Sequence, residues 1–153
     1  MKRFPLLLAL LMMTACEQHQ AEDNVVHTEQ PSLHQTLPKI DNIQHDYETA
    51  LSLATEQNKS VFMLVESENC RWCQKLKATT LQDETMIERL NREFVVLLID
   101  RDRDRYPSNF EVKGVPMVFM LDAQGSIYTS LVGYRSDPRE YTKWFDYIQI
   151  ERE

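Results

Sequence analysis

The sequence predicts an α/β fold in which helices cover both faces of a mixed β-sheet. Two continuous apolar runs, residues 61–65 and 94–99, have the length and composition of strands buried on both faces. Helical apolar stripes flank and separate these runs, which calls for a parallel pair of strands. Two further segments, residues 115–121 and 126–132, are joined by a four-residue turn and predict an antiparallel hairpin.

The first half of the predicted domain alternates helices with the two buried strands. A helix is expected to begin beside Asp46, because apolar side chains then recur at helical spacing. Asn69 is expected to cap a helix over residues 70–78, and another short helix is expected over residues 83–91. The apolar stripes of the first and third of these helices are Tyr47, Ala50, Leu51 and Ala54, and Met86, Ile87 and Leu90.

The second half is expected to contain a loop, the hairpin and a last helix. Acidic and basic residues alternate over 100–105, as in a solvated loop. Asp137 is expected to cap the last helix, with Pro138 at its first position and Glu140 completing a capping box. The buried stripe of this helix is predicted to be Tyr141, Trp144, Phe145 and Ile148.

The N-terminal residues 1–15 have the features of an export signal. Lys2 and Arg3 precede an apolar run over residues 4–13, within the range of a signal peptide. The run is shorter than the roughly 20 residues that a transmembrane helix needs. With a threonine and an alanine before Cys16, the segment resembles a bacterial lipoprotein signal, in which the cysteine is lipidated and becomes the mature N-terminus. The alternative is an ordinary cleaved signal with a chance cysteine.

The chain is therefore expected to comprise a signal peptide (1–15), a flexible tether (16–44) and a domain (45–153). The tether is polar, and a loose chain of its length spans on the order of 30 Å. We expect the domain to face the periplasm of a bacterial cell envelope, held to a membrane by lipid on Cys16. Glu17, rather than aspartate, follows this cysteine, and by resemblance to lipoprotein sorting this favours the outer membrane over the inner one.

Size and charge narrow the classes of protein further. A chain of 153 residues accommodates one ordinary domain with extensions. Its formal net charge of −7 disfavours a nucleic-acid-binding role, which requires a basic face. No nucleic-acid partner is expected.

The sequence Cys70-Arg71-Trp72-Cys73 is the strongest chemical signal in the chain. It follows a predicted buried strand and opens a predicted helix, whose N-terminal dipole favours a thiolate at Cys70. The positive charge of Arg71 also favours the thiolate, whereas the negative charges of Glu66 and Glu68 disfavour it. The spacing of three residues places Cys73 on the same helical face, close enough to form a disulfide.

These residues predict a redox-active disulfide that carries out thiol–disulfide exchange on protein disulfides or thiols. Cys70 is expected to attack a partner disulfide, and Cys73 to resolve the mixed disulfide. The chemistry requires no cofactor, but it requires an upstream redox partner. Whether the pair acts as reductant, oxidant or isomerase stays open, because its surroundings set the potential over a wide range.

Residues 45–150 resemble the thioredoxin superfamily in three features: the strand–CRWC–helix unit, the Gly114-Val115-Pro116 element, and the final hairpin and helix. The resemblance implies a thioredoxin-like mixed sheet. It also implies that Pro116 follows a cis peptide bond and packs on the cysteine pair, and that the backbone of Val115 pairs with an incoming peptide. Trp72 is a candidate substrate contact or a lid over the cysteines.

The sequence departs from thioredoxin at two places. Arginine and tryptophan replace glycine and proline between the cysteines, and Leu64 occupies the position of the buried aspartate. Glu66, at the end of the same strand, is a possible substitute for that aspartate, but we expect it to be exposed.

Other interpretations of the cysteine pair are weaker. A zinc site needs four ligands, and the sequence has no second CxxC. A structural disulfide closing so short a loop removes little chain entropy. The alternative from another class is a tethered thioredoxin-fold binding protein or copper metallochaperone, whose thiolates would bind copper(I) without turnover. Such a protein could use the histidines in or beside the tether, which are His19, His27, His34 and His45.

Overall fold

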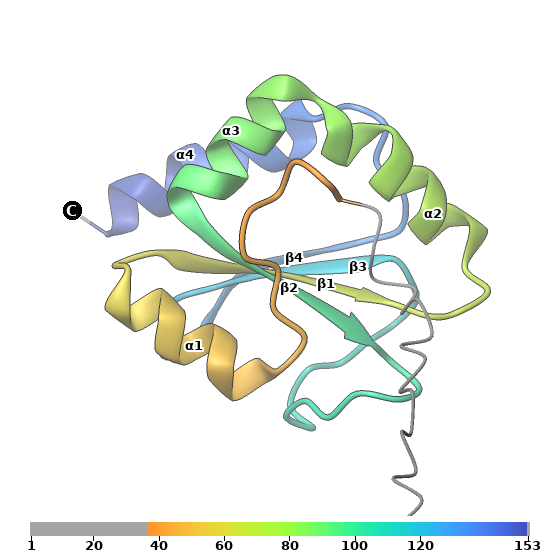
Figure 1. Ribbon diagram of the computed structural model, residues 1–153, viewed down its shortest axis with the longest axis horizontal. Helices are drawn as coiled ribbons and strands as arrows, with labels where there is room; N and C mark the ends of the chain where they lie inside the picture. Colours follow the sequence, from red (N-terminus) through yellow and green to blue (C-terminus); the bar gives the residue numbers. More distant parts are fainter. Residues whose placement is uncertain (1–36, 153) are drawn as a thin grey trace, which may run out of the picture. The chain divides into compact units, whose positions relative to one another are not determined.

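The computed structural model describes residues 37–152 and contains one four-stranded mixed sheet (Figure 1). Its strands lie in the order β2-β1-β3-β4, so β1 is central and β2 and β4 are the edges. The strands are β1 (Ser60–Glu66), β2 (Phe94–Asp100), β3 (Met117–Leu121) and β4 (Ile127–Val132).

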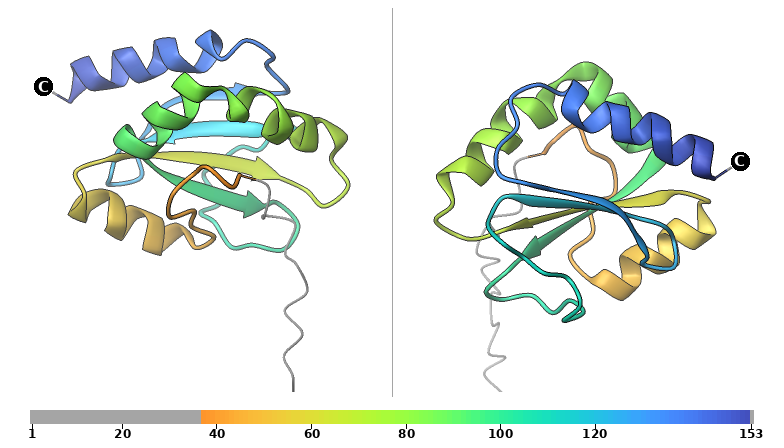
Figure 2. Two further views of the ribbon diagram at one scale, coloured as in Figure 1. Left: turned by 45° about the horizontal axis from the view of Figure 1, so that its top comes forward. Right: turned by 180° about the vertical axis from the view of Figure 1, so that it is seen from behind.

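Helices cover both faces of this sheet, which confirms the predicted fold class. Helix α1 lies on one face, and α2, α3 and α4 lie on the other, as all views show (Figures 1 and 2). The helices are α1 (Tyr47–Glu56), α2 (Arg71–Ala78), α3 (Glu84–Glu93) and α4 (Arg139–Glu151), with a short 3-10 helix, η1 (Thr80–Gln82), between α2 and α3.

The strand directions agree with the sequence prediction. Strands β1 and β2 are parallel and pair from Ser60 with Phe94 to Glu66 with Asp100. Strand β3 is antiparallel to both β1 and β4. Because β1 and β2 are parallel, their acidic last residues, Glu66 and Asp100, lie side by side where both strands end.

Alternation along the strands divides the core into two layers. In β1, Phe62 and Leu64 face α2, α3 and α4, whereas Val61, Met63 and Val65 face α1. Every residue of β1, β2 and β3 is buried, as continuous apolar runs predict.

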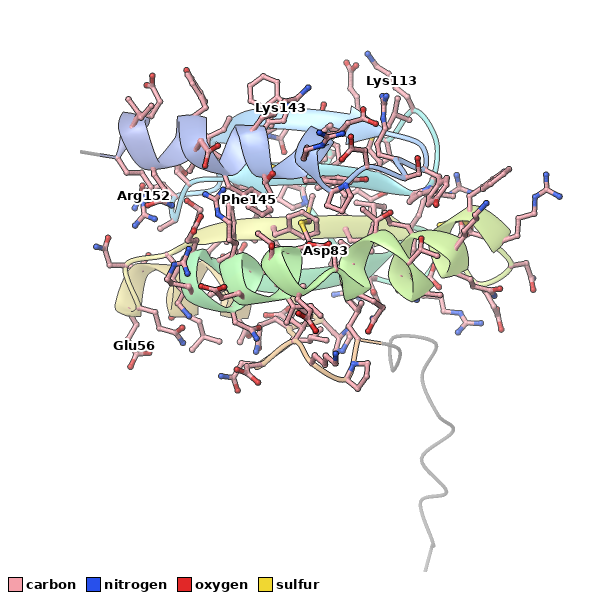
Figure 3. All side chains as sticks on the ribbon, turned by 90° about the horizontal axis from the view of Figure 1, so that it is seen from above. Glu56, Asp83, Lys113, Lys143, Phe145 and Arg152 are labelled. Carbon is pink, nitrogen blue, oxygen red and sulfur yellow. A yellow bond between two sulfur atoms is a disulfide. The ribbon has the colours of Figure 1, made fainter. Side chains whose placement is uncertain are left out.

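Aromatic side chains fill the layer beneath α3 and α4. Phe145 lies between these two helices in Figure 3, with its ring 4.5 Å from that of Phe94 between centroids. Phe62 packs edge-on against both Phe94 and Phe145. Such contacts explain why the last helix has an aromatic buried stripe.

Capping side chains fix where most helices begin. The carboxylate of Asp46 accepts a hydrogen bond from the Thr49 backbone N–H, and Asp83 accepts one from Met86. Helix α2 differs from its prediction, because its N-cap is Cys70 rather than Asn69.

The start of α4 also differs from the predicted capping box. The N-cap is Pro138 rather than the predicted Asp137, although Asp137 still accepts a hydrogen bond from the Arg139 N–H at 2.9 Å. The carboxylate of Glu140 instead binds Arg135, at 3.2 Å. An arginine within reach outcompetes the backbone N–H that a capping box would use.

Residues 37–44 correct the predicted boundary between tether and domain. Leu37 and Ile40 are buried in the core beneath α3 and α4. Gln44 lies beside the edge strand β2, donating its N–H to Val96 and accepting the Leu98 N–H. These contacts attach residues 37–44 to the domain, while the predicted signal, Cys16 and the rest of the tether lie outside the described residues.

Within residues 37–152, none of the helices combines the length and apolar character needed to cross a membrane.

Candidate redox site

The cysteine pair lies where β1 passes into α2. After β1, a turn closes with a hydrogen bond from the Cys70 N–H to the Ser67 carbonyl. Cys70 caps α2, and its sulfur accepts a hydrogen bond from the Cys73 N–H at 3.1 Å. The two cysteines form a disulfide, with their Cα atoms 5.2 Å apart.

The two sulfur-bearing residues differ in exposure. Cys73 is 1% exposed, whereas Cys70 is half-buried at the end of the helix. A partner approaching from solvent therefore reaches Cys70 first. Cys70 also lies at the positive end of the α2 dipole, which stabilises a thiolate there.

The acidic residues near Cys70 are both paired with cations. Glu68 binds Arg103 in an exposed ion pair, and Glu66 binds Lys77. From the sequence, the negative charges of Glu66 and Glu68 were expected to disfavour a thiolate at Cys70. Their cationic partners offset that effect.

Glu66 corrects a sequence prediction, because it is 4% exposed rather than an exposed strand end. Its carboxylate lies 2.6 Å from the ammonium of Lys77, whose side chain is 3% exposed. Lys77 follows Cys73 by four residues, so both lie on the buried face of α2. An ion pair is thus enclosed one helical turn from the inner cysteine.

A pocket beside the pair brings together three residues predicted as substrate contacts. Trp72, Val115 and Pro116 line it together with Gly133 and Tyr134, enclosing about 280 Å³. The Val115–Pro116 peptide bond is cis, as the resemblance implies.

An aromatic stack forms one wall of this pocket. The rings of Trp72 and Tyr134 lie 5.7 Å apart between centroids and 19° from parallel. Sequence reasoning missed Tyr134, Gly133 and the buried Lys77. Tyr134 comes two residues after the hairpin, and Lys77 is a lone charge in a buried stripe. These two signals could have drawn attention to both residues.

Two further features bear on other kinds of site. A hollow of about 350 Å³ lies over β3 and β4, but none of the predicted site residues lines it. Among residues 37–152, no three histidine, cysteine or acidic side chains gather as metal ligands would.

Comparison with known proteins identifies the family. A model described as a thioredoxin-like domain matches residues 47–149. The chain belongs to this family of thioredoxin-like domains. A comparison with curated proteins found no match.

Solved structures share the fold at low sequence identity. A thioredoxin from Thermus thermophilus is 23% identical, with a TM-score of 0.60, and the match covers 72% of this chain and 90% of that one. A DsbH oxidoreductase is 20% identical, with a TM-score of 0.53, covering 74% and 89%. A thioredoxin h from poplar is 24% identical, with a TM-score of 0.52, covering 71% and 96%. These similarities establish the fold alone.

Proposed function

We propose that this protein is a thiol–disulfide oxidoreductase that acts through Cys70 and Cys73. The observation that carries the proposal is the asymmetric pair, in which a half-buried Cys70 caps α2 and is bonded to a buried Cys73. A nucleophile at the surface and a resolving thiol behind it are what disulfide exchange requires.

In the reducing direction, the Cys70 thiolate attacks one sulfur of a partner disulfide. The partner's S–S bond breaks, a mixed disulfide forms, and one partner sulfur leaves as a thiolate. The Cys73 thiolate then attacks the Cys70 sulfur and releases the second partner thiolate. Two electrons pass from the pair to the partner, which takes up two protons, and Cys70–Cys73 is oxidised. The reverse sequence oxidises a dithiol.

The setting that we propose is the bacterial cell envelope. An export signal ending at Cys16 supports a lipid-anchored domain facing the periplasm, with the outer membrane favoured where two membranes are present. Thiol- or disulfide-containing proteins would be its substrates there. An upstream redox partner would restore the pair after each exchange.

Trapping of mixed disulfides tests the roles of the two cysteines. In the full chain carrying Cys16→Ser, so that only the pair is available, Cys73→Ser should accumulate a mixed disulfide with a disulfide-bonded peptide. Cys70→Ser should not accumulate one, because the remaining Cys73 is 1% exposed. Intact-mass spectrometry under non-reducing conditions measures both adducts.

Matched conditions make the result decisive. Both variants are compared at equal protein and peptide concentrations, after circular dichroism has shown equal folding. Equal trapping by both variants would contradict the assigned roles. Trapping by neither would contradict the proposed function.

A further inference from the structure

We propose that the pocket beside the cysteine pair binds an acidic segment of the partner polypeptide next to its reacting cysteine. The pocket is the one lined by Trp72, Val115, Pro116, Gly133 and Tyr134, and we call it the aromatic pocket. This inference rests on the proposed function and specifies the class of substrate.

The aromatic pocket offers an apolar surface that the fold leaves open. Trp72 is 42% exposed although it is one of the largest side chains in the chain. Stacking on Tyr134 holds its ring in place without burying it. Because Trp72 lies between the two cysteines in sequence, the wall that it forms is two residues from Cys70 along the chain.

Two cations stand over this aromatic surface. The guanidinium carbon of Arg71 lies 4.8 Å from the centre of the Trp72 ring. The ammonium of Lys75 lies 5.3 Å from the Trp72 ring and 5.0 Å from the Tyr134 ring. Cation–π contact of this kind attracts the charges to the rings and leaves them in solvent, and both Arg71 and Lys75 are exposed.

These cations differ from others in residues 37–152, many of which are paired with acids. Arg89 binds Glu93 and Asp146, for example, whereas neither Arg71 nor Lys75 forms an ion pair within this part of the chain. Their charge is therefore available to a ligand. A carboxylate is the usual partner of both an ammonium and a guanidinium.

The net negative charge of the chain does not cancel the local positive charge of Arg71 and Lys75. At physiological ionic strength, charges farther apart than about 8 Å are largely screened. An acidic side chain in contact with the Trp72 ring would be about that close to both cations, which lie 4.8 and 5.3 Å from the centre of the ring. Apolar contact with the rings and charge contact with the cations would then favour an acidic flank over a neutral one.

Binding of matched peptides tests the inference without requiring turnover. Two peptides carry serine in place of the reacting cysteine, one with aspartate and glutamate beside it and one with the corresponding amides. Isothermal titration calorimetry against the full oxidised chain gives both dissociation constants. We expect the acidic peptide to bind about threefold to tenfold more tightly, as one or two exposed charge contacts allow.

Lys75→Gln provides the matched test of charge, since Lys75 is exposed and lies outside the Cys70–Cys73 loop. It should weaken binding of the acidic peptide about twofold to fivefold and leave the amide peptide unchanged. Lys143→Gln removes the same charge from α4, outside the aromatic pocket, and should change neither constant (Figure 3). Equal affinity for the two peptides, or equal effects of both lysine variants, would overturn the inference.

Cysteine-containing forms of the peptides separate this inference from the proposed function. Exchange with both peptides, with kcat/KM higher for the acidic one, supports both. Exchange without an acidic preference overturns the inference alone. A binding preference without exchange by either peptide overturns the proposed function and leaves the acidic docking site standing.

Discussion

Glu66 and Lys77 form an ion pair in the interior of the domain. Each side chain is at most 5% exposed, so both charges have lost most of their contact with water. Mutual attraction at 2.6 Å offsets part of that loss. Removal of one partner leaves the other charge buried, which generally costs more than replacement of both.

Lys77→Met should therefore destabilise the domain by about 3–5 kcal/mol. The double variant Glu66→Leu with Lys77→Met should regain most of that loss, because neither charge of this pair remains buried. Urea denaturation of the four members of this cycle measures the coupling between the two residues. If the two single effects simply add in the double variant, the two side chains do not act as a pair.

At the scale of residues, the sequence predicted the cysteines because residue type, spacing and position after a strand all pointed the same way. It did not predict the burial of Glu66. A charged residue at a strand end is usually exposed, and the partner that makes burial possible lies on α2, 11 residues further along. Tyr134 was missed for the same reason, since its stacking on Trp72 depends on how the segment after β4 returns to α2.

At the scale of elements, capping of α1 predicts a dependence on pH. Hydrogen bonds from the Thr49 hydroxyl and backbone N–H lower the pKa of Asp46 below its usual 3.8. A carboxylate with a lowered pKa in the folded state stabilises the fold above its unfolded pKa. That contribution disappears as the pH falls through the folded pKa.

Asp46→Asn isolates this charge, because asparagine caps helices about as well as aspartate. We expect the wild-type chain to be the more stable of the two near pH 7. The difference should shrink as the pH falls below about 5 and should vanish once the pH lies below the lowered pKa of the folded state. Thermal unfolding across this range measures it, and a difference independent of pH would show that the ionised carboxylate contributes nothing.

Element positions were predicted better than element ends. Continuous apolar runs located the strands, and helical stripes located the helices, since both patterns reflect burial. The cap of α2 was misplaced by one residue, because a cysteine sulfur rather than an asparagine side chain accepts the hydrogen bond. The first turn of α4 differed because Arg135 competes for Glu140.

At the scale of the molecule, the parallel pair and the hairpin were both predicted, but their order across the sheet was not. Placement of β3 beside β1 depends on contacts between segments far apart in the chain. The domain boundary was set too late for a related reason. Leu37 and Ile40 are isolated apolar residues in a polar stretch, and only the assembled core shows where they are buried.

The central claim is that Cys70 and Cys73 form an exchanging redox pair rather than a structural disulfide. Its most direct test is the equilibrium of the full chain, carrying Cys16→Ser, with glutathione buffers of known ratio, followed by alkylation and intact-mass measurement. We expect reversible conversion between dithiol and disulfide, with a midpoint between about −120 and −270 mV, the range of exchange-active proteins. A midpoint below about −300 mV, which is typical of structural disulfides, would contradict the claim.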